Sequence, residues 1–411
     1  MKIANVDVKD LKEKYGTPLY IFDQEKIEAN MLAYKNNLVS NEFETEVLFA
    51  SKAFNVKEII RIAKTLDISL DVVSLGELYT AIKVDFPMNH VYFHGNNKST
   101  LELTYCLNYG VGEIVVDNLD ELKELDKLTK ELKKEAHILI RLNVGISAHT
   151  HKYIMTAYVD SKFGVLYDSV DFKQMQEIIN NSKYIKLDGF HSHIGSQIFD
   201  LEAFSSAAKK MASYLKDYNY PMILNLGGGF GVRYTKDDSP IPFDIVSKTL
   251  INSVESVLHD ENIKLKKLAI EPGRSIVGEA GYTLYTVGYT KKTPNKEYYF
   301  IDGGMTDNIR PALYQAKYDA DIIGKENEPK NTIVTIAGKC CESGDLIIED
   351  YPIQKASSGD LLITYTTGAY GYSMSSNYNK ALTPAVVFVK NGQSKLVVRR
   401  MTLDELIERE E

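Results

Sequence analysis

Residues 46–54 read EVLFASKAF, and the interpretation of the whole chain starts from them. Within this stretch VLFA (47–50) is a short apolar run, which is typical of a buried strand. Lys52 follows the run, and a lysine at the end of a buried strand must pair with an anion or lose part of its charge. It either extends its ammonium group to solvent or acts as a nucleophilic amine that forms a Schiff base with a carbonyl compound.

The composition indicates an ordinary globular protein. The chain has 411 residues, which is too many for one compact core, so two domains are expected. The net charge is -8 and no basic run stands out, which argues against a nucleic-acid partner. The N-terminus lacks the apolar core of a signal peptide, and no stretch reaches membrane-spanning length. We expect a cytoplasmic protein without membrane contact. Its three cysteines form neither a disulfide framework nor a zinc motif.

Eight apolar runs alternate with segments of helical spacing in the first two thirds of the chain. These runs are VLFA (47–50), LDVVS (70–74), VYFHG (91–95), EIVVD (113–117), ILIRLNV (138–144), LDGFHSH (187–193), MILNLGG (222–228) and KLAIEPG (267–273). Eight strands alternating with helices predict an α/β fold, a (β/α)8 TIM-type barrel over residues 24–275. A doubly wound open sheet has the same periodicity and is the structural alternative.

After residue 275 the pattern changes to strands. Runs such as YTLYTVGY (282–289) and NTIVTIAG (331–338) have few helical segments between them. A hairpin is expected to turn at Asn391-Gly392, because this pair suits a tight turn between two strands. The pattern after residue 275 therefore predicts a mostly β domain.

Polar residues at the ends of the predicted barrel strands are the catalytic candidates, because active sites of such barrels lie there. Lys52 closes the first strand, Asp71 lies in the second, and glycines 227–229 close the seventh. Glycine amides allow an anion to approach, and phosphate sites of these barrels follow strands seven and eight. The alternative is that the three glycines only form a turn and bind no anion. Glu271 at the eighth strand either pairs with Arg274 or keeps a ring nitrogen protonated.

Two histidines at the sixth strand leave a second possibility open. His191 and His193 point the same way on a strand, and two such histidines can be zinc ligands. A metal site would need further ligands, which His149 and His151 in AHTH could supply. The alternative is one core histidine and one that faces the site, with no metal.

Three polar, glycine-rich stretches of the β domain contain more polar side chains than simple turns need. They read DGGMTDNIRPALY, GKCCESGD and TTGAYGYSMSSNYN. Their notable side chains are Arg310, Tyr314, Cys341, Glu342 and Tyr370.

Eleven short motifs occur in the order of a known family. They are FASKAF, DVVSLGEL, FHGNNKS, AHTHKYI, SKFG, HSHIGSQ, LGGGFG, EPGRS, DGGMTDNIRPALY, CESGD and GAYGY. Through them nearly the whole chain resembles the diaminopimelate decarboxylases, within the fold-type III pyridoxal phosphate-dependent decarboxylases. The resemblance implies an alanine-racemase-like barrel and a β domain formed by residues 1–23 with 276–411.

The resemblance also implies a cofactor site for pyridoxal 5'-phosphate. Lys52 would carry the cofactor as a Schiff base, His193 would stack on its pyridine ring, and Glu271 would pair with its ring nitrogen. The remaining implied cofactor contacts are Asp71, Ser196, Gly228, Gly229, Gly273, Arg274 and Tyr370.

A substrate site and a proton donor are implied in the same way. The implied contacts of the amino-acid substrate are Arg274, Arg310, Tyr314, Glu342 and Tyr370. Cys341 would be the proton donor, delivered together with Glu342 from the partner subunit of a homodimer. The alternative, a loop that folds back over its own barrel, stays open.

The implied reaction is decarboxylation of meso-2,6-diaminopimelate to L-lysine and carbon dioxide, the last step of lysine biosynthesis. Arg310 with Glu342 favours a substrate that carries both charges at its far end. The same chemistry on carboxynorspermidine, ornithine or arginine, a zinc-dependent hydrolase and a non-catalytic homologue are the alternatives. Two positions depart from the family: Phe54, where asparagine is frequent, and Lys339, where proline is frequent. Lys339 bears on substrate preference, because it would alter the charge near the far end of the substrate.

Overall fold

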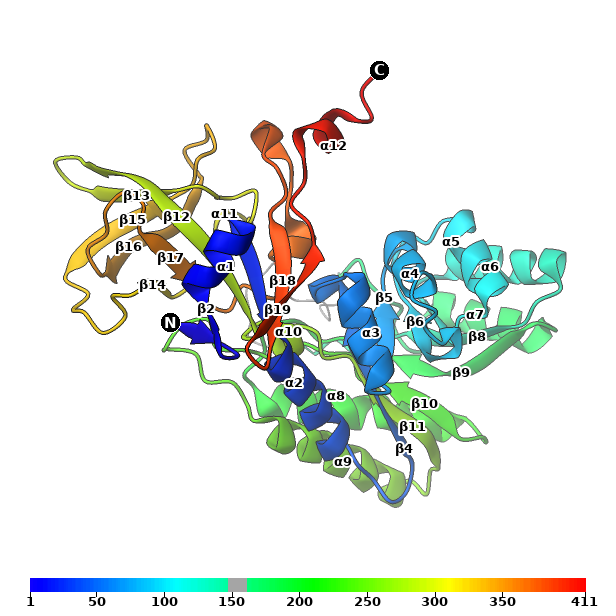
Figure 1. The fold of residues 1–411 in the computed structure, drawn as a ribbon. Helices are drawn as coiled ribbons and strands as arrows, with labels where there is room; N and C mark the ends of the chain where they lie inside the picture. Colours follow the sequence, from blue (N-terminus) through cyan, green and yellow to red (C-terminus); the bar gives the residue numbers. More distant parts are fainter. Residues whose placement is uncertain (147–160) are drawn as a thin grey trace. The chain divides into compact units, whose positions relative to one another are not determined.

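The computed structural model describes residues 1–146 and 161–411, which form two compact units (Figure 1). The barrel unit comprises Asn30–Gly231 and Pro240–Gly273. The β unit comprises Met1–Ala29, Val232–Ser239 and Arg274–Glu411. The motif AHTHKYI, with His149 and His151, lies outside the described residues.

Eight parallel strands close the barrel unit into a ring, in the order β10-β11-β4-β5-β6-β7-β8-β9. Their bounds are β4 (Glu44–Ala50), β5 (Ser69–Val72), β6 (Val91–Phe93), β7 (Glu113–Val116), β8 (Ala136–Arg141), β9 (Ile185–His191), β10 (Met222–Asn225) and β11 (Leu265–Ile270). Pairing of β11 with β4, with Ile270 opposite Val47, completes the ring. Each predicted apolar run overlaps one of these strands, so the barrel is confirmed and the open sheet is excluded.

Buried side chains fill the barrel and explain its closure. Leu48, Tyr92, Val115, Leu139, Ile223 and Ala269 come from six different strands and form one cluster, each at most 2% exposed. Alternate residues of barrel strands point inward, so one apolar residue per strand is enough for a packed centre.

Helices lie outside the strands of the barrel unit (Figure 1). They are α3 (Lys57–Thr65), α4 (Leu75–Ile82), α5 (Thr100–Tyr109), α6 (Leu119–Leu132), α7 (Val170–Asn181), α8 (Leu201–Ser213) and α9 (Phe243–Asp260), and α2 (Gln24–Asn37) leads into the unit. The sequence periodicity indicates all of them except α4, which has only eight residues. Its start is nevertheless encoded, because the Ser74 side chain accepts a hydrogen bond from the backbone N–H of Glu77.

The β unit is built on a mixed sheet with the strand order β16-β15-β13-β12-β3-β18-β19. Its strands are β3 (Leu19–Asp23), β12 (Gly281–Lys292), β13 (Glu297–Ile301), β14 (Ala320–Ile322), β15 (Thr332–Ala337), β16 (Leu346–Ile353), β17 (Leu361–Thr364), β18 (Ala385–Lys390) and β19 (Gln393–Val398), beside β1 (Lys2–Ile3) and β2 (Val6–Asp7). Its short helices are α1 (Val8–Tyr15), α10 (Arg274–Val277), α11 (Arg310–Tyr314) and α12 (Leu403–Ile407). The N-terminal strand β3 pairs with both β12 and β18.

The predicted hairpin is present, with Lys390 opposite Gln393 in the register of β18 and β19. Asn391 and Gly392 have φ values of 50° and 73°, the left-handed conformation that a two-residue hairpin turn requires. Strands β14 and β16 are not indicated by the sequence pattern. The first has three residues, and the second includes charged residues and a proline.

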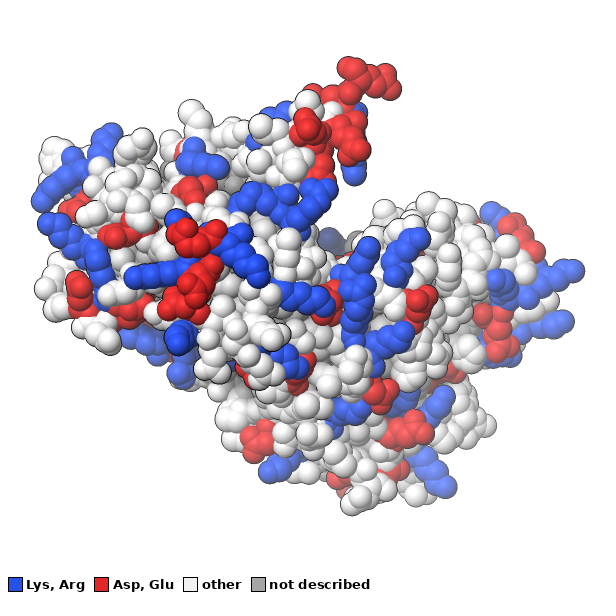
Figure 2. Space-filling view, viewed as in Figure 1, with Lys and Arg blue, Asp and Glu red and all other residues white. Residues whose placement is uncertain are grey.

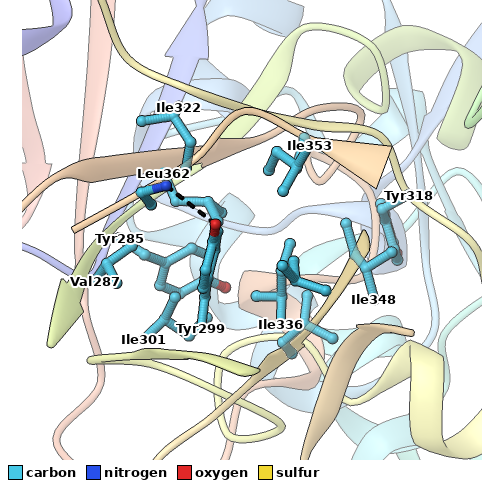
Figure 3. Close-up of a cluster of buried hydrophobic side chains, with 14 of the residues drawn as sticks. Tyr285, Val287, Tyr299, Ile301, Tyr318, Ile322, Ile336, Ile348, Ile353 and Leu362 are labelled. Atoms are coloured by element: carbon cyan, nitrogen blue, oxygen red, sulfur yellow. Dashed lines mark hydrogen bonds between the residues drawn. The ribbon is translucent and has the colours of Figure 1, made fainter. Parts of the chain in front are cut away.

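A cluster of aromatic and branched side chains forms the core of the β unit (Figure 3). Tyr285, Tyr299 and Leu362 in it are fully buried. The hydroxyl of Tyr299 accepts a hydrogen bond from the backbone N–H of Ala356 at 3.1 Å, so its polar end is satisfied inside the core.

The charged surface is mixed in sign. On the face drawn in Figure 2, basic and acidic side chains are interspersed over both units. Among the described residues, no helix has the length and apolar character needed to span a bilayer.

Candidate active site

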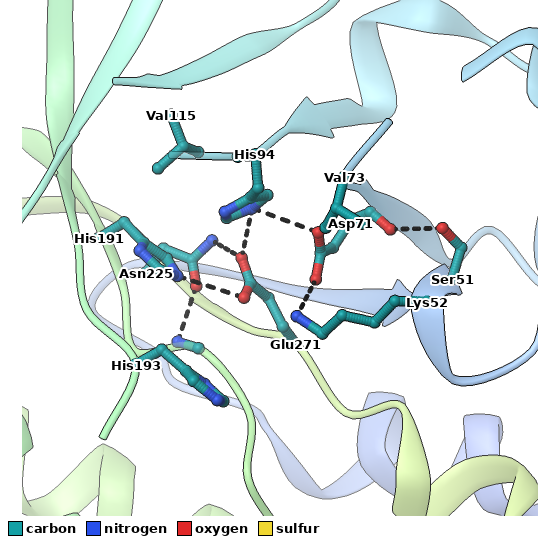
Figure 4. A network of polar contacts seen from close by, with 12 residues as sticks. Ser51, Lys52, Asp71, Val73, His94, Val115, His191, His193, Asn225 and Glu271 are labelled. Carbon is teal, nitrogen blue, oxygen red and sulfur yellow. Dashed lines mark hydrogen bonds and ion pairs between the residues drawn. The ribbon is translucent and has the colours of Figure 1, made fainter. Parts of the chain in front are cut away.

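Lys52 lies in a short 3-10 turn, Ser51–Ala53, directly after β4 (Figure 4). Its Nζ is 3.3 Å from Oδ2 of Asp71, which is fully buried in β5, whereas the Lys52 side chain is 38% exposed. The hydroxyl of Ser51 donates to the backbone carbonyl of Asp71 at 2.7 Å and fixes the turn against β5. Lys52 is therefore paired with a buried carboxylate and still reachable from outside, as a nucleophilic amine requires.

Glu271 follows β11 and is the centre of the polar network in Figure 4. Its Oε1 accepts from Nδ2 of Asn225 at 2.8 Å, and its Oε2 accepts from Nε2 of His191 at 3.2 Å. Nε2 of His94 lies 2.9 Å from Oε1. Burial alone would raise the pKa of Glu271, but His94 and His191 lower it well below its usual value. The site thus holds a buried, ionised carboxylate.

His191 and His193 have different partners, although only Ser192 separates them in sequence. Burial lowers the pKa of His191 to about 4, so the ring is neutral and donates from Nε2 to Glu271. Burial and the positive charge of Lys52 also lower the pKa of His193, and its Nδ1 accepts from the backbone N–H of Gly228 at 3.2 Å. Strand β9 ends at His191, so the alternation that would align the two rings stops there. In these contacts the two histidines do not share a hydrogen-bond partner.

The glycine loop after β10 lies so close to neighbouring backbone that only glycine fits at its positions. A Cβ on Gly228 would lie 2.1 Å from the carbonyl oxygen of Glu271, and one on Gly229 would lie 2.3 Å from that of Gly195. Gly229 also has a φ of +104°. The loop is therefore a bare-backbone cradle of the kind that accommodates a phosphate. Ser196 lies in the loop after β9, and Gly273 follows β11.

Several buried polar atoms in the barrel unit have no hydrogen-bond partner among the described residues. Four of them belong to residues 71–192 around this network: Oδ1 of Asp71, Nε2 of His94, Nδ1 of His191 and Oγ of Ser192. Buried polar atoms are normally satisfied, so such a group requires an explanation. A lysine amine suits an aldehyde, an ionised carboxylate suits a protonated ring nitrogen, and a glycine cradle suits a phosphate. The residues present thus fit pyridoxal phosphate.

In the β unit, two buried arginines lie among tyrosines. Arg274 donates from Nη1 to the hydroxyl of Tyr234, and its guanidinium carbon lies 4.8 Å from the ring centre of Tyr370. Arg310 lies 4.8 Å from the ring centre of Tyr234 and donates to the hydroxyl of Tyr318 at 2.5 Å. Ring faces attract guanidinium groups, so the tyrosines hold both cations in place.

Arg310 has no carboxylate within ion-pair distance in the described part of the chain, although it is only 7% exposed. Its partners there are the neutral rings and hydroxyls of the tyrosines. A buried guanidinium without an acidic partner is suited to bind an anion that comes from outside, and its planar fork matches a carboxylate.

The predicted proton donor lies on a different loop of the β unit, between β15 and β16. Cys341 and Glu342 are both exposed, and the backbone N–H of Cys341 donates to Oδ1 of Asn379 at 2.9 Å. Asp345 accepts from the backbone N–H groups of Met305 and Cys340, at 2.5 Å and 2.8 Å, which fixes the base of this loop. Tyr314 ends α11 and is half-buried.

Four residues of these two networks were not singled out from the sequence: His94, Asn225, Tyr234 and Tyr318. His94 directly follows β6 and Asn225 ends β10, so the rule that found Lys52 also applies to them once the strand ends are known. No sequence signal marks Tyr234 and Tyr318, since their contact with the arginines depends on the folded β unit.

Comparison with known proteins gives consistent results. Residues 24–278 match the family model described as pyridoxal-dependent decarboxylase, pyridoxal binding domain. The chain is 47% identical over 406 residues to the diaminopimelate decarboxylase of Bacillus methanolicus. The aligned region covers 97% of this chain and 94% of that relative. The chain is 46% identical to the enzyme of Bacillus subtilis (strain 168), with 99% and 94% covered. The crystal structure of diaminopimelate decarboxylase from M. jannaschii in co-complex with L-lysine matches with a TM-score of 0.92 at 33% identity, covering 98% of this chain and 94% of that one.

Proposed function

Because the chain belongs to the diaminopimelate decarboxylases, within the pyridoxal-dependent decarboxylase family, we propose which of its residues carry out each part of that reaction. The enzyme removes one carboxylate of diaminopimelate as carbon dioxide and yields lysine, in the last step of lysine biosynthesis, and its cofactor is pyridoxal phosphate. The observation that carries the assignment is the Lys52–Asp71 pair in one network with the buried, ionised Glu271.

The barrel unit holds the cofactor in this proposal. When bound, pyridoxal phosphate supplies an electron sink for the electron pair that the departing carboxylate leaves behind. Lys52 would hold the cofactor through its amine. Glu271 would stabilise a proton at the ring nitrogen and with it the positive charge of the ring. His193 would contact the ring, and the backbone of the glycine loop, with Ser196, would hold the phosphate.

The other proposed cofactor contacts have supporting roles. Asp71 balances the charge of Lys52 from inside β5, where its carboxylate is fully buried. The residues proposed to complete the phosphate site are Gly228, Gly229, Gly273, Arg274 and Tyr370.

In this proposal the β unit provides the residues that bind the substrate. Arg310 binds the carboxylate at the end of the substrate that does not react, because it is a buried cation held by tyrosines. Glu342 binds the ammonium group at the same end. Arg274, Tyr314 and Tyr370 complete the substrate contacts.

We propose a homodimer in which the active sites are shared, with Cys341 and Glu342 supplied by the partner subunit. Cys341 delivers a proton to the carbon that has lost its carboxylate, which a thiol can do in a suitable environment. The exposure of both side chains supports this assignment, since an exposed loop is free to contact a second copy.

A substrate panel tests the proposed function. Carbon dioxide release is measured from meso-2,6-diaminopimelate, ornithine, arginine and carboxynorspermidine, each with and without added pyridoxal phosphate. We expect cofactor-dependent release from diaminopimelate, with lysine as the product. Faster release from another member of the panel would contradict the assignment of Arg310 and Glu342.

A further inference from the structure

His94 lies between two buried carboxylates of the barrel unit (Figure 4). Its Nε2 is 2.9 Å from Oε1 of Glu271 and 3.6 Å from Oδ1 of Asp71. The His94 side chain is 6% exposed, and those of Glu271 and Asp71 are 3% and 0% exposed. One imidazole thus links the carboxylate proposed for the ring nitrogen with the carboxylate that pairs with Lys52.

The contacts of His94 are not those of an ordinary core histidine. Neither its Nε2 nor Oδ1 of Asp71 makes a directed hydrogen bond to a described residue, although both lie within ion-pair distance. A histidine that only fills space in a core is normally hydrogen-bonded. The orientation of Glu271 is fixed by directed bonds from Asn225 and His191 instead. The contribution of His94 is therefore mainly electrostatic.

The charges around His94 explain why this contribution matters. Asp71 is paired with Lys52, and Asp117 is paired with Arg141 of β8 at 3.6 Å. Both ion-pair partners that the described residues give Glu271 are histidines.

Burial lowers the pKa of His191 to about 4, so this ring is neutral. The rings of His94 and His191 lie 4.8 Å apart at 71°. Of the two rings His94 comes nearer to Glu271, at 2.9 Å against 3.2 Å, and the polar Nε2 edge of its ring faces the carboxylate. A buried carboxylate without compensation would take up a proton itself.

We propose that His94 is a positioning residue for the cofactor ring: from its place between Glu271 and Asp71 it keeps the Glu271 carboxylate ionised and available to the ring nitrogen. The inference rests on the proposed role of Glu271. Without His94, Glu271 retains its own proton more readily. The ring nitrogen then loses its proton at a lower pH than in the wild type.

Three substitutions separate this role from simple packing. His94→Gln keeps an amide N–H near the place of Nε2. His94→Asn keeps a polar group, but its shorter amide corresponds to Nδ1 and does not reach Glu271. His94→Leu removes the polar group and keeps the bulk.

The readout is the protonation state of the ring nitrogen. Each full-length variant is reconstituted with pyridoxal phosphate that carries ¹⁵N in its ring, and the ¹⁵N chemical shift is followed against pH. We expect His94→Leu and His94→Asn to lower the midpoint by about one pH unit or more, a tenfold change in the equilibrium. His94→Gln should restore most of the difference.

The outcomes distinguish the inference from the function on which it rests. Glu271→Gln is the reference variant, and if it leaves the ¹⁵N signal unchanged, the proposed role of Glu271 fails. If Glu271→Gln moves the midpoint and the His94 variants do not, the inference about His94 alone is wrong. Should His94→Leu fail to fold or to bind cofactor, the comparison of His94→Asn with His94→Gln decides, and equal midpoints overturn the inference.

Discussion

Replacing Tyr318 by phenylalanine should weaken the binding of ligands that carry a carboxylate at the end far from the cofactor. The Tyr318 hydroxyl is a fixed hydrogen-bond partner of Arg310, at 2.5 Å, and it also contacts Oδ1 of Asn308 at 3.4 Å. The substitution removes these contacts and keeps the ring, which lies 5.8 Å from the guanidinium carbon. Arg310 stays in place but is less firmly oriented.

The expected magnitude follows from what remains around Arg310. Loss of a hydrogen bond to a charged group costs about 1.5–3 kcal/mol. The ring of Tyr234, 4.8 Å from the guanidinium carbon, still supports Arg310, so we expect the lower end of that range. This corresponds to roughly tenfold weaker binding. Arg310→Leu removes the ion pair itself, which costs about 2–5 kcal/mol, so its effect should exceed that of Tyr318→Phe.

Two ligands that differ only in the carboxylate provide the assay. L-lysine has it and cadaverine lacks it, and the binding of both is followed by the change in cofactor absorbance. Tyr318→Phe should raise the Kd of L-lysine and leave that of cadaverine nearly unchanged. Tyr234→Phe is the matched control, because it removes the hydroxyl bonded to Arg274 and keeps the ring that faces Arg310. Equal losses for both ligands in Tyr318→Phe would refute the assignment of Arg310 to the distal carboxylate.

Three further predictions concern the ring nitrogen, the stability of the β unit and the subunit arrangement. Glu271→Gln should retain cofactor and lose kcat rather than only raise KM, because the charge on the ring matters when electrons enter it; an unchanged kcat in steady-state assays would exclude this role. Burial raises the pKa of Asp307 to about 7, so the folded protein binds a proton there that the unfolded chain releases at lower pH. Stability should therefore fall as pH rises from about 4 to about 7, by up to about 1.4 kcal/mol per unit, and denaturant titrations should show a flatter profile for Asp307→Asn; identical profiles would contradict the shift. Mixing Lys52→Ala with Cys341→Ala subunits should restore roughly a quarter of wild-type activity, since half the dimers are mixed and one of their two sites is intact; background activity despite tag-verified exchange would reject the shared site.

The sequence predicts the barrel well because its strands are buried on both faces. Such strands appear as nearly continuous apolar runs, as in VLFA (47–50), and their number is easily counted. Helix α4 and strands β14 and β16 are short or carry charged residues, so their formation depends on neighbours rather than on a local pattern.

The candidate site was likewise predictable only where a local sequence pattern marks its residues. Lys52 and Glu271 were predicted because each closes an apolar strand, and the structure brings Asp71, His94 and His191 into one network around them. The different partners of His191 and His193 could not be predicted, because β9 ends between them. The contact of Tyr234 with Arg310 joins segments that are distant in sequence, whereas Tyr318 follows Arg310 by eight residues; neither contact is marked by a sequence pattern, and only the folded β unit shows them.

The most direct test of the central claim is to locate the lysine that holds the cofactor. The purified enzyme with pyridoxal phosphate is reduced with borohydride, digested, and mapped by mass spectrometry, with Lys52→Ala as the control. The account predicts a pyridoxyl group on the peptide that contains FASKAF, at Lys52, and no reducible attachment in Lys52→Ala. A pyridoxyl group at another lysine in both proteins, or none in the wild type, would contradict it.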